Sequence, residues 1–226
     1  MPTENNDEKK GNNMTKLILI RHGYSEANEK HCFAGHSDAD LTEQGLRQAE
    51  KTAEFIAENY KVDAIYSSDL KRAYKTAEKT AEKFGLEIIK TPALREIYAG
   101  DWEMKSYDEL EKLYPSEYST WRNDIGNAHP NGGESVAQLG ERVCAVLEKI
   151  VRENPGKTIV AATHATPIRV SECIRAGRPL SEMKEIPWVA NASVTVINFE
   201  NGYFEYELKG EDSFLEEIKT ILPKNV

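Results

Sequence analysis

The chain has 226 residues, of which 39% are hydrophobic and 30% charged, and its formal net charge is −9 at pH 7. This acidic balance argues against non-specific nucleic-acid binding, which needs a basic surface, and no apolar run is long enough to cross a bilayer. Three cysteines without a CxxC pair favour a reducing environment over a disulfide framework. We therefore expect a cytoplasmic protein with no nucleic-acid or membrane partner.

The N-terminal residues, 1–14, are polar and lack the apolar core of a signal peptide, so we predict a disordered leader. Residues 15–226 are predicted to form one domain. Its first element is an apolar run, 17–20, that leads directly into Arg21 and His22. Such a run predicts a strand buried on both faces, which ends at the sheet edge where α/β proteins place their chemistry.

Helices and strands alternate in the next part of the chain. Apolar residues at helical spacing predict a helix over 43–59, and a second over 70–84, with Ser68-Asp69 as its N-terminal cap. Strands are predicted over 62–67 and 86–90.

Residues 95–133 depart from this alternation and are predicted to form a lid over the sheet edge. Within them, Ser106 and Glu109 form a capping box that opens a short helix, and a second short helix is predicted over 116–123.

The longest predicted helix runs from the capping box of Ser135 to about residue 153. The next predicted strand, 158–163, leads into His164. Thr166 is expected to cap the helix that follows, with Pro167 at its first position.

The last elements are a hairpin and a helix. Strands over 194–199 and 203–208 flank Asn201-Gly202, a strong turn signal. An amphipathic helix that begins at Ser213 is expected to dock on the domain, although a homodimer contact is the alternative. The whole pattern predicts an α/β fold: a three-layer α/β/α sandwich, with a mainly parallel sheet, an antiparallel edge strand and a small lid subdomain.

Two of the predicted strands end in histidine, and both are close to groups that bind anions. Arg21 precedes His22, and His164 precedes a helix whose free N–H groups begin at Ala165. Arg72 lies in the first turn of another helix, at the same sheet edge. Together these groups predict a pocket for a phosphoryl group, with a small phosphorylated metabolite as the ligand.

A neutral imidazole is a competent nucleophile toward phosphorus, so His22 is the candidate for attack. The leaving oxygen then needs a proton, and Glu96, in the loop after the third strand, is the best candidate acid. Asp101 and Glu103 lie near it in the sequence and are its competitors for this role.

Five sets of residues resemble the motifs of the histidine phosphatase superfamily, the phosphoglycerate-mutase-like family, in order and over about residues 16–199. They are Arg21-His22-Gly23 with Asn28, the run from Ser67 to Ala73, Glu96 with Gly100-Asp101-Trp102-Glu103, Pro130 with Gly133-Glu134-Ser135, and Thr163-His164.

The resemblance implies a metal-independent phosphatase without a cofactor, in which His22 is phosphorylated and Glu96 donates the proton. It also implies that the phosphoryl group is bound by Arg21, Arg72 and His164, and that Asn28 lines the same pocket. Four positions depart from the family pattern and leave the substrate open; they are Tyr24, His36, Asp40 and Met104.

Two other functions are compatible with this pattern. A cofactor-dependent phosphoglycerate mutase would use the same pocket, but it needs cations for the substrate carboxylate. Residues 97–133 offer only Arg122, Lys105 and Lys112, which favours the phosphatase. A non-catalytic adaptor that binds a phosphoryl ligand is disfavoured by the intact set of catalytic residue types.

Two side-chain clusters have competing interpretations. His31, His36 and His129 match no standard metal-ligand spacing, so we interpret them as polar loop residues. Aromatic residues of the lid predict either a wall for an organic leaving group or the core of the lid itself; they are Trp102, Tyr107, Tyr114, Tyr118 and Trp121.

Overall fold

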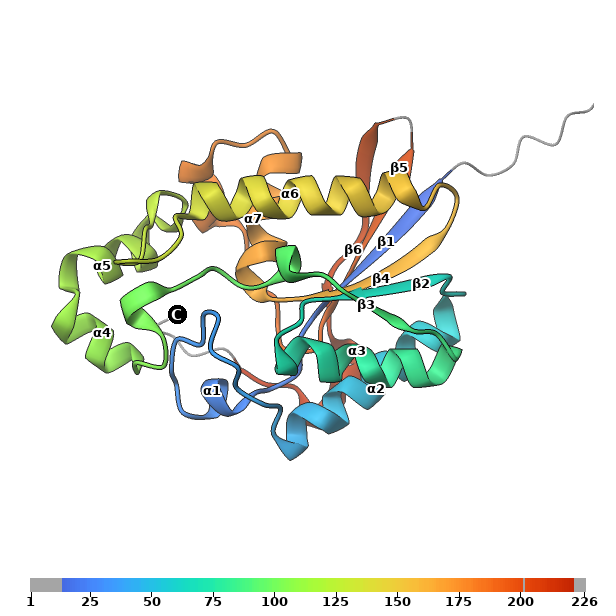
Figure 1. Ribbon diagram of the computed structural model, residues 1–226, viewed down its shortest axis with the longest axis horizontal. Coiled ribbons are helices and arrows are strands. Elements are labelled where there is room, and N and C mark those ends of the chain that lie inside the picture. The colour runs from blue at the N-terminus through green and yellow to red at the C-terminus, as the bar shows by residue number, and fades with distance from the viewer. Residues whose placement is uncertain (1–13, 201, 222–226) are drawn as a thin grey trace, which may run out of the picture.

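A six-stranded sheet forms the centre of the computed structural model, which describes residues 14–200 and 202–221 (Figure 1). The strand order is β3-β2-β4-β1-β5-β6. Strands β1 to β4 are mutually parallel, β5 runs antiparallel to β1, and β6 runs antiparallel to β5 and forms the edge. The strands are β1 (Thr15–Arg21), β2 (Ala64–Ser67), β3 (Ile88–Lys90), β4 (Thr158–Thr163), β5 (Val194–Glu200) and β6 (Tyr203–Glu211).

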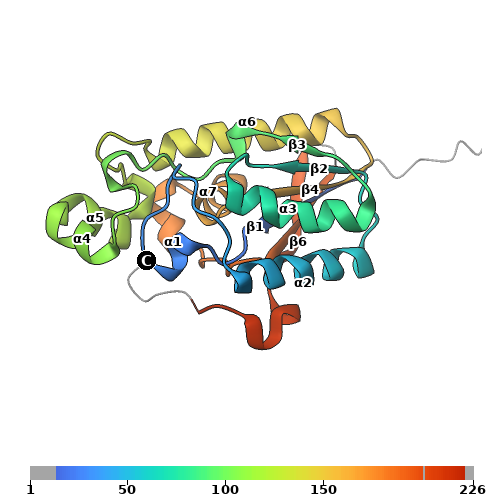
Figure 2. The ribbon, with the colours of Figure 1, turned by 60° about the horizontal axis from the view of Figure 1, so that its bottom comes forward.

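Helices cover both faces of the sheet, which confirms the predicted three-layer sandwich. Figures 1 and 2 show α6 on one side of the strands and α2 with α3 on the other. The helices are α1 (Glu26–Glu29), α2 (Glu43–Asn59), α3 (Lys71–Phe84), α4 (Tyr107–Leu113), α5 (Pro115–Asn123), α6 (Val136–Glu153) and α7 (Ala165–Arg175).

The apolar run of β1 divides its side chains between two cores. Leu17 and Leu19 pack in the cluster on the α6 side, whereas Ile18 and Ile20 pack in the cluster on the α2 side. Because successive side chains of a strand point to opposite faces, a strand covered on both sides must be apolar at every position. Each such buried side chain contributes about 1.5–3 kcal/mol, so β1 is a rigid mount for the residues at its end.

The local helix signals are confirmed where their partners are close in sequence. Ser106 with Glu109 and Ser135 with Gln138 form the predicted capping boxes. Gly85 ends α3 in the left-handed conformation, at φ +64°.

Two predicted helix starts are wrong. The N-cap of α3 is Leu70, which has no capping side chain, and Ser68 binds the side chain of His164 instead. The N-cap of α7 is His164, so Pro167 occupies the third helical position. Proline fits there because the first N–H groups of a helix have no partner within it.

The predicted C-terminal helix is also wrong. Ser213–Ile218 forms 3₁₀ turns that are interrupted at Glu216, where φ is +50°. The Ser213 side chain binds Glu211 rather than capping a helix. The segment nevertheless docks on the domain, as predicted, and lies beside α2 (Figure 2). The rings of Phe214 and Phe55 are stacked there, with their centroids 4.5 Å apart. The predicted leader, apart from Met14, and Asn201 of the hairpin lie outside the described residues.

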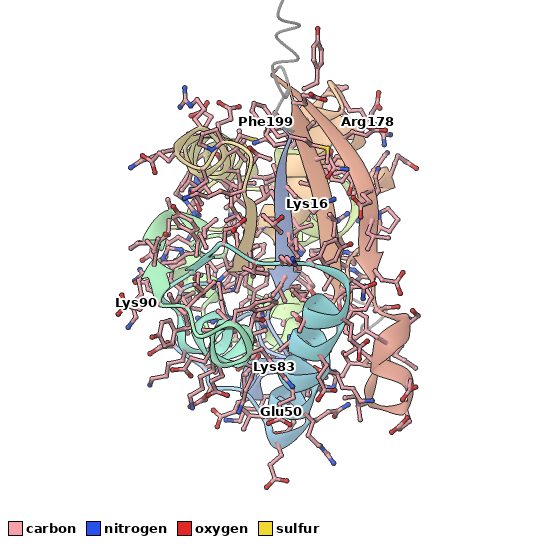
Figure 3. All side chains as sticks on the ribbon, turned by 90° about the vertical axis from the view of Figure 1, so that its right-hand side faces the viewer. Lys16, Glu50, Lys83, Lys90, Arg178 and Phe199 are labelled. Atoms are coloured by element: carbon pink, nitrogen blue, oxygen red, sulfur yellow. The ribbon has the colours of Figure 1, made fainter. Side chains whose placement is uncertain are left out.

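Exposed ion pairs join the outer surfaces of α2 and α3, on the face where Figure 3 labels Glu50 and Lys83. Lys79 pairs with Glu50 at 3.3 Å, and Lys83 pairs with Glu54 at 3.7 Å. Such exposed pairs contribute at most about 1 kcal/mol each. The charged side chains of α2 form a solvent-exposed helix face.

The loop after β1 is held against the first turn of α2 by two glycines. A Cβ built on Gly45 would lie 2.0 Å from the Tyr24 carbonyl oxygen, and one on Gly23 would lie 2.5 Å from the Gly45 oxygen. Only glycine permits this approach of two backbones, and it fixes the direction in which the chain leaves β1.

We expect Gly45→Ala to lower the free energy of unfolding by about 2–4 kcal/mol, because the methyl group clashes with backbone that cannot move without displacing the loop after β1. Urea denaturation of Gly45→Ala and Gly85→Ala measures this. Gly85 has open space around it, so its substitution carries only the left-handed strain of about 1–2 kcal/mol. Equal losses in the two variants would contradict the steric argument.

Candidate active site

A cleft of about 800 Å³, including its open mouth, lies at the carboxyl ends of β1 and β4. Of the predicted site residues, all but His164 line it: Arg21, His22, Asn28, Arg72, Glu96 and Ala165. The His164 ring lies against the His22 ring, with the two centroids 5.2 Å apart. The sheet topology has thus brought together residues that are more than a hundred positions apart in the sequence.

The proton and the lone pair of His22 are fixed by its neighbours. Nδ1 lies 2.7 Å from the Gly23 carbonyl oxygen, which can only accept, so Nδ1 carries the proton. Nε2 lies 3.3 Å from Arg72 Nε, which can only donate, so Nε2 carries the lone pair. Burial, together with the charges of Arg72 and Arg21, holds the pKa of His22 well below 6.5. The imidazole is therefore neutral, with its lone pair toward Arg72.

Arg72 is held by backbone carbonyls rather than by a carboxylate. Its Nη1 donates to the Ser37 carbonyl oxygen and its Nη2 to the Gly35 oxygen, both at 2.8 Å. Burial lowers its pKa to about 10, and the charge of Glu96 partly opposes this. An arginine with no ion pair of its own keeps its positive field for an anion in the cleft.

Arg21, at the end of β1, is also held by a backbone carbonyl rather than by a carboxylate. Its Nη1 donates to the Val189 carbonyl oxygen at 2.5 Å, while its buried Nε has no partner among the described residues. Burial lowers its pKa to about 10, again against the opposing charge of Glu96. The guanidinium therefore retains a donor for a ligand.

His164 is oriented by Ser68. Its Nε2 lies 2.9 Å from Ser68 Oγ, and its buried Nδ1 has no partner in the described structure. The Leu70 N–H donates to the same serine oxygen at 3.4 Å, so the hydroxyl proton is free to donate to Nε2. In this tautomer Nδ1 carries a proton. Burial and the Arg72 charge hold the pKa of His164 well below 6.5.

The Glu96 carboxylate lies beside the N-terminus of α7. Its Oε1 accepts from the Ile97 N–H at 2.9 Å, and its Oε2 accepts from the Thr166 N–H at 3.4 Å. The competing Glu103 is engaged outside the cleft, where it accepts from the His36 N–H and the Ser37 hydroxyl. Asp101 accepts from the Asn131 side chain, also outside the cleft.

Asn191, which sequence reasoning missed, connects the cleft to the segment before β5. Its Nδ2 lies 3.2 Å from both the His22 carbonyl oxygen and Asn28 Oδ1. Asn28 Oδ1 also accepts from Ser25, which leaves the Asn28 Nδ2 to donate into the cleft. A neutral amide in a loop carries no sequence signal that separates it from surface asparagines.

The positions that depart from the family pattern have distinct roles. Tyr24 lines the cleft. His36 binds the Glu96 carbonyl oxygen at 2.8 Å, and Asp40 pairs with Lys75 at 2.6 Å. Met104 has a φ of +59°, which a glycine adopts without strain.

The two interpretations of the aromatic cluster each hold for part of it. Trp102 and Tyr118 are buried in the core, Trp121 belongs to that core and also borders the cleft, and Tyr107 lines the cleft. Within residues 14–200 and 202–221, no three His, Cys, Asp or Glu side chains are grouped so that they could hold a metal ion. None of the helices in those ranges is long and apolar enough to span a membrane.

Residues 17–212 match the family model of the histidine phosphatase superfamily (branch 1). The chain is 36% identical over 187 residues to phosphoserine phosphatase 1 of Hydrogenobacter thermophilus, which covers 83% of this chain and 88% of that protein.

Two solved structures share the fold. YhfR of Bacillus stearothermophilus superposes with a TM-score of 0.85 at 29% identity, over 89% of this chain and 100% of that one. A mycobacterial glucosyl-3-phosphoglycerate phosphatase, in complex with VO3, superposes with a TM-score of 0.80 at 27% identity, over 87% and 99%.

Because the pKa of His22 is depressed in the folded chain, we expect the free energy of unfolding to decrease as the pH is lowered. Below pH 6.5 the unfolded chain takes up a proton that the folded chain cannot, so stability is lost as the pH falls toward the folded pKa. Relative to His22→Gln, the wild type should lose up to about 1.4 kcal/mol of unfolding free energy per pH unit in this window. Denaturation at pH 7.5, 6.5 and 5.5 measures the difference.

The control is Tyr203→Phe, at a side chain that is 79% exposed on the hairpin; its curve should run parallel to that of the wild type. If the His22→Gln curve also runs parallel, the folded protein binds the proton at His22 as readily as the unfolded chain does.

Proposed function

The chain belongs to the histidine phosphatase superfamily, and on that premise we propose that it hydrolyses small phosphomonoesters through a phosphohistidine formed on His22. The observation that carries the proposal is the Nε2 lone pair of His22, which faces Arg72 in a cleft that Arg21 also lines, with no carboxylate paired to either arginine. A nucleophile and the positive field for its target therefore share one cleft.

The phosphoryl group binds between Arg21 and Arg72. Arg21 Nε, His164 Nδ1 and the Asn28 amide are donors left unused by the protein, and the N-terminus of α7 adds the field of its free N–H groups at Ala165. Donors placed around the equatorial oxygens stabilise the charge that develops in phosphoryl transfer.

In the first step His22 Nε2 attacks phosphorus, and the bond between phosphorus and the leaving oxygen breaks. Glu96 gives its proton to that oxygen, so the product leaves as a neutral alcohol. In the second step the Glu96 carboxylate takes a proton from water, whose oxygen attacks phosphorus. The P–N bond breaks, its electron pair returns to Nε2, and inorganic phosphate is released. No step uses a metal ion.

The mutase alternative has little support in the cleft. Arg122 pairs with the exposed Glu111 at 3.4 Å, and Lys105 binds the Asp101 carbonyl oxygen. Neither lines the cleft in the described structure, so neither is placed to bind the carboxylate of a phosphoglycerate.

We expect His22→Ala to lose the phosphoenzyme and more than about 10³-fold in kcat, because no other side chain is placed to attack. Acid and base quenching of enzyme incubated with ³²P-labelled 4-nitrophenyl phosphate, with a chelator present, measures an acid-labile, base-stable label. The exposed His129→Ala serves as the control and should keep both label and rate. A label that persists in His22→Ala would place the nucleophile elsewhere.

Glu96→Gln should slow an alkyl ester much more than an activated aryl ester. General acid catalysis contributes about 10²–10⁴-fold when the leaving group is a poor one, whereas 4-nitrophenolate leaves without a proton. The kcat/KM values for benzyl phosphate and 4-nitrophenyl phosphate test this, because kcat/KM reports the steps up to departure of the leaving group and excludes hydrolysis of the phosphoenzyme, in which Glu96 acts on both esters alike. In Glu103→Gln, whose carboxylate lies outside the cleft, any change should be small and equal for the two esters. An equal loss for both esters in Glu96→Gln would remove it from the proton-donor role.

A further inference from the structure

The cleft has a second half, beyond the phosphoryl-binding residues, that must accommodate the leaving group. Its wall is largely aromatic; the rings are those of Tyr24, Phe33, Tyr107, Trp121 and Trp188. Phe33 and Trp121 meet edge to face at 4.9 Å, and Trp121 and Trp188 lie 6.3 Å apart. These contacts join rings from three separate segments of the chain into one continuous surface.

Trp188 is held in place from behind by a buried cation. The Arg169 guanidinium lies 3.9 Å from the Trp188 ring centroid and is itself only 3% exposed. Arg169 Nε and Nη2 both donate to the Ile186 carbonyl oxygen, and Nη2 also donates to the Met183 oxygen. The backbone on the N-terminal side of Trp188 is thereby fixed, so this part of the wall is preorganised rather than mobile.

Within residues 14–200 and 202–221, this half of the cleft offers no lysine or arginine to a ligand. Among the described lining residues the only lysine or arginine side chains are Arg21 and Arg72, at the phosphoryl end, and the two histidines are the nucleophile His22 and the exposed His31. A carboxylate on the leaving group would lose its hydration against aromatic rings without gaining a charged partner. A flat apolar group would gain buried area and ring contacts instead.

We propose that this chain selects phosphomonoesters whose leaving group is flat and uncharged, such as an arylmethyl alcohol, over those whose leaving group carries a carboxylate. The inference rests on the proposed phosphatase function and names its substrate class. The phosphoserine phosphatase relative is named for a substrate whose leaving group carries a carboxylate. The aromatic wall of this chain instead favours a leaving group without one.

The test compares kcat/KM for benzyl phosphate with that for O-phospho-L-serine and for 3-phosphoglycerate. All three release a primary alcohol, so activation of the leaving group does not favour benzyl phosphate. We expect benzyl phosphate to be preferred at least about tenfold, the range that a matched apolar pocket provides. Equal or higher kcat/KM for either carboxylate substrate overturns the proposal.

The reference substrate, 4-nitrophenyl phosphate, separates this failure from failure of the phosphatase function. Turnover of 4-nitrophenyl phosphate together with a preference for phosphoserine leaves the function standing and removes the substrate class. No turnover of any of the four esters removes the function and, with it, the inference that rests on it.

Trp188→Leu tests whether the wall causes the preference. The ratio of kcat/KM for benzyl phosphate to that for phosphoserine should fall at least about fivefold, mainly through KM for the benzyl ester. Tyr203→Leu is the matched control, because Tyr203 is an exposed aromatic residue on the hairpin and outside the cleft lining; it should keep the wild-type ratio. An unchanged ratio in a folded Trp188→Leu variant, checked by circular dichroism, overturns the role of the wall.

A second variant does not depend on removing a packed tryptophan. Tyr24→Lys places a cation at a partly exposed position of the wall. It should raise kcat/KM for 3-phosphoglycerate relative to benzyl phosphate at least about fivefold, because the carboxylate then has a partner. No change in this ratio contradicts the argument that the missing cation excludes carboxylates.

Discussion

The arrangement at the active site depends on one constraint: two buried arginines must lie beside a histidine that stays neutral. A carboxylate close to each arginine would satisfy the charge but would also cancel the field that an anionic ligand needs. The protein uses backbone carbonyls instead, from Ser37 and Gly35 for Arg72 and from Val189 for Arg21. Carbonyl dipoles orient a guanidinium without neutralising it, and burial together with the same cations holds the pKa of His22 down.

This constraint explains why segments that carry no catalytic side chain pack so closely around the cleft. The segment 183–191 contributes carbonyls to Arg169 and Arg21, and its last residue, Asn191, reaches the His22 carbonyl. One stretch of backbone therefore couples α7, the end of β1 and the Trp188 wall. The carbonyl that holds Arg21 and the ring of Trp188 thus belong to one short segment.

Much of the fold follows from local signals in the sequence. The bounds of α2 and α6 agree with the apolar spacing and the capping residues, because both signals act within a few residues. The failures share a cause. Ser68 and Ser213 have hydroxyls that a helix start would use, but His164 and Glu211 bind them instead. A cap requires the hydroxyl oxygen to accept from a backbone N–H of the first helical turn, and tertiary contacts decide whether the side chain stands in that position.

In the candidate site, too, the residues placed by local signals could be predicted, whereas those placed by tertiary contacts could not. His22 and His164 could be placed from sequence because each follows a buried strand, and parallel strands end at one edge. The carbonyls that hold the arginines could not be predicted, since every residue has one. The sequence could not decide which aromatic residues of the lid line the cleft, because an aromatic side chain there fits a buried core and a ligand-binding surface equally well.

The two ends of the cleft are built from different kinds of backbone. The phosphoryl end is built on strand ends and first helical turns, where backbone geometry leaves little freedom. The leaving-group end is built from the segment after α1, the lid and the segment 183–191, which connect elements rather than form the sheet. Replacing a wall side chain there alters the surface that faces the leaving group but removes none of the backbone carbonyls that hold Arg21 and Arg72. The same phosphoryl end can therefore serve different substrates, and on the proposal made above the charge of the leaving-group wall is what selects among them.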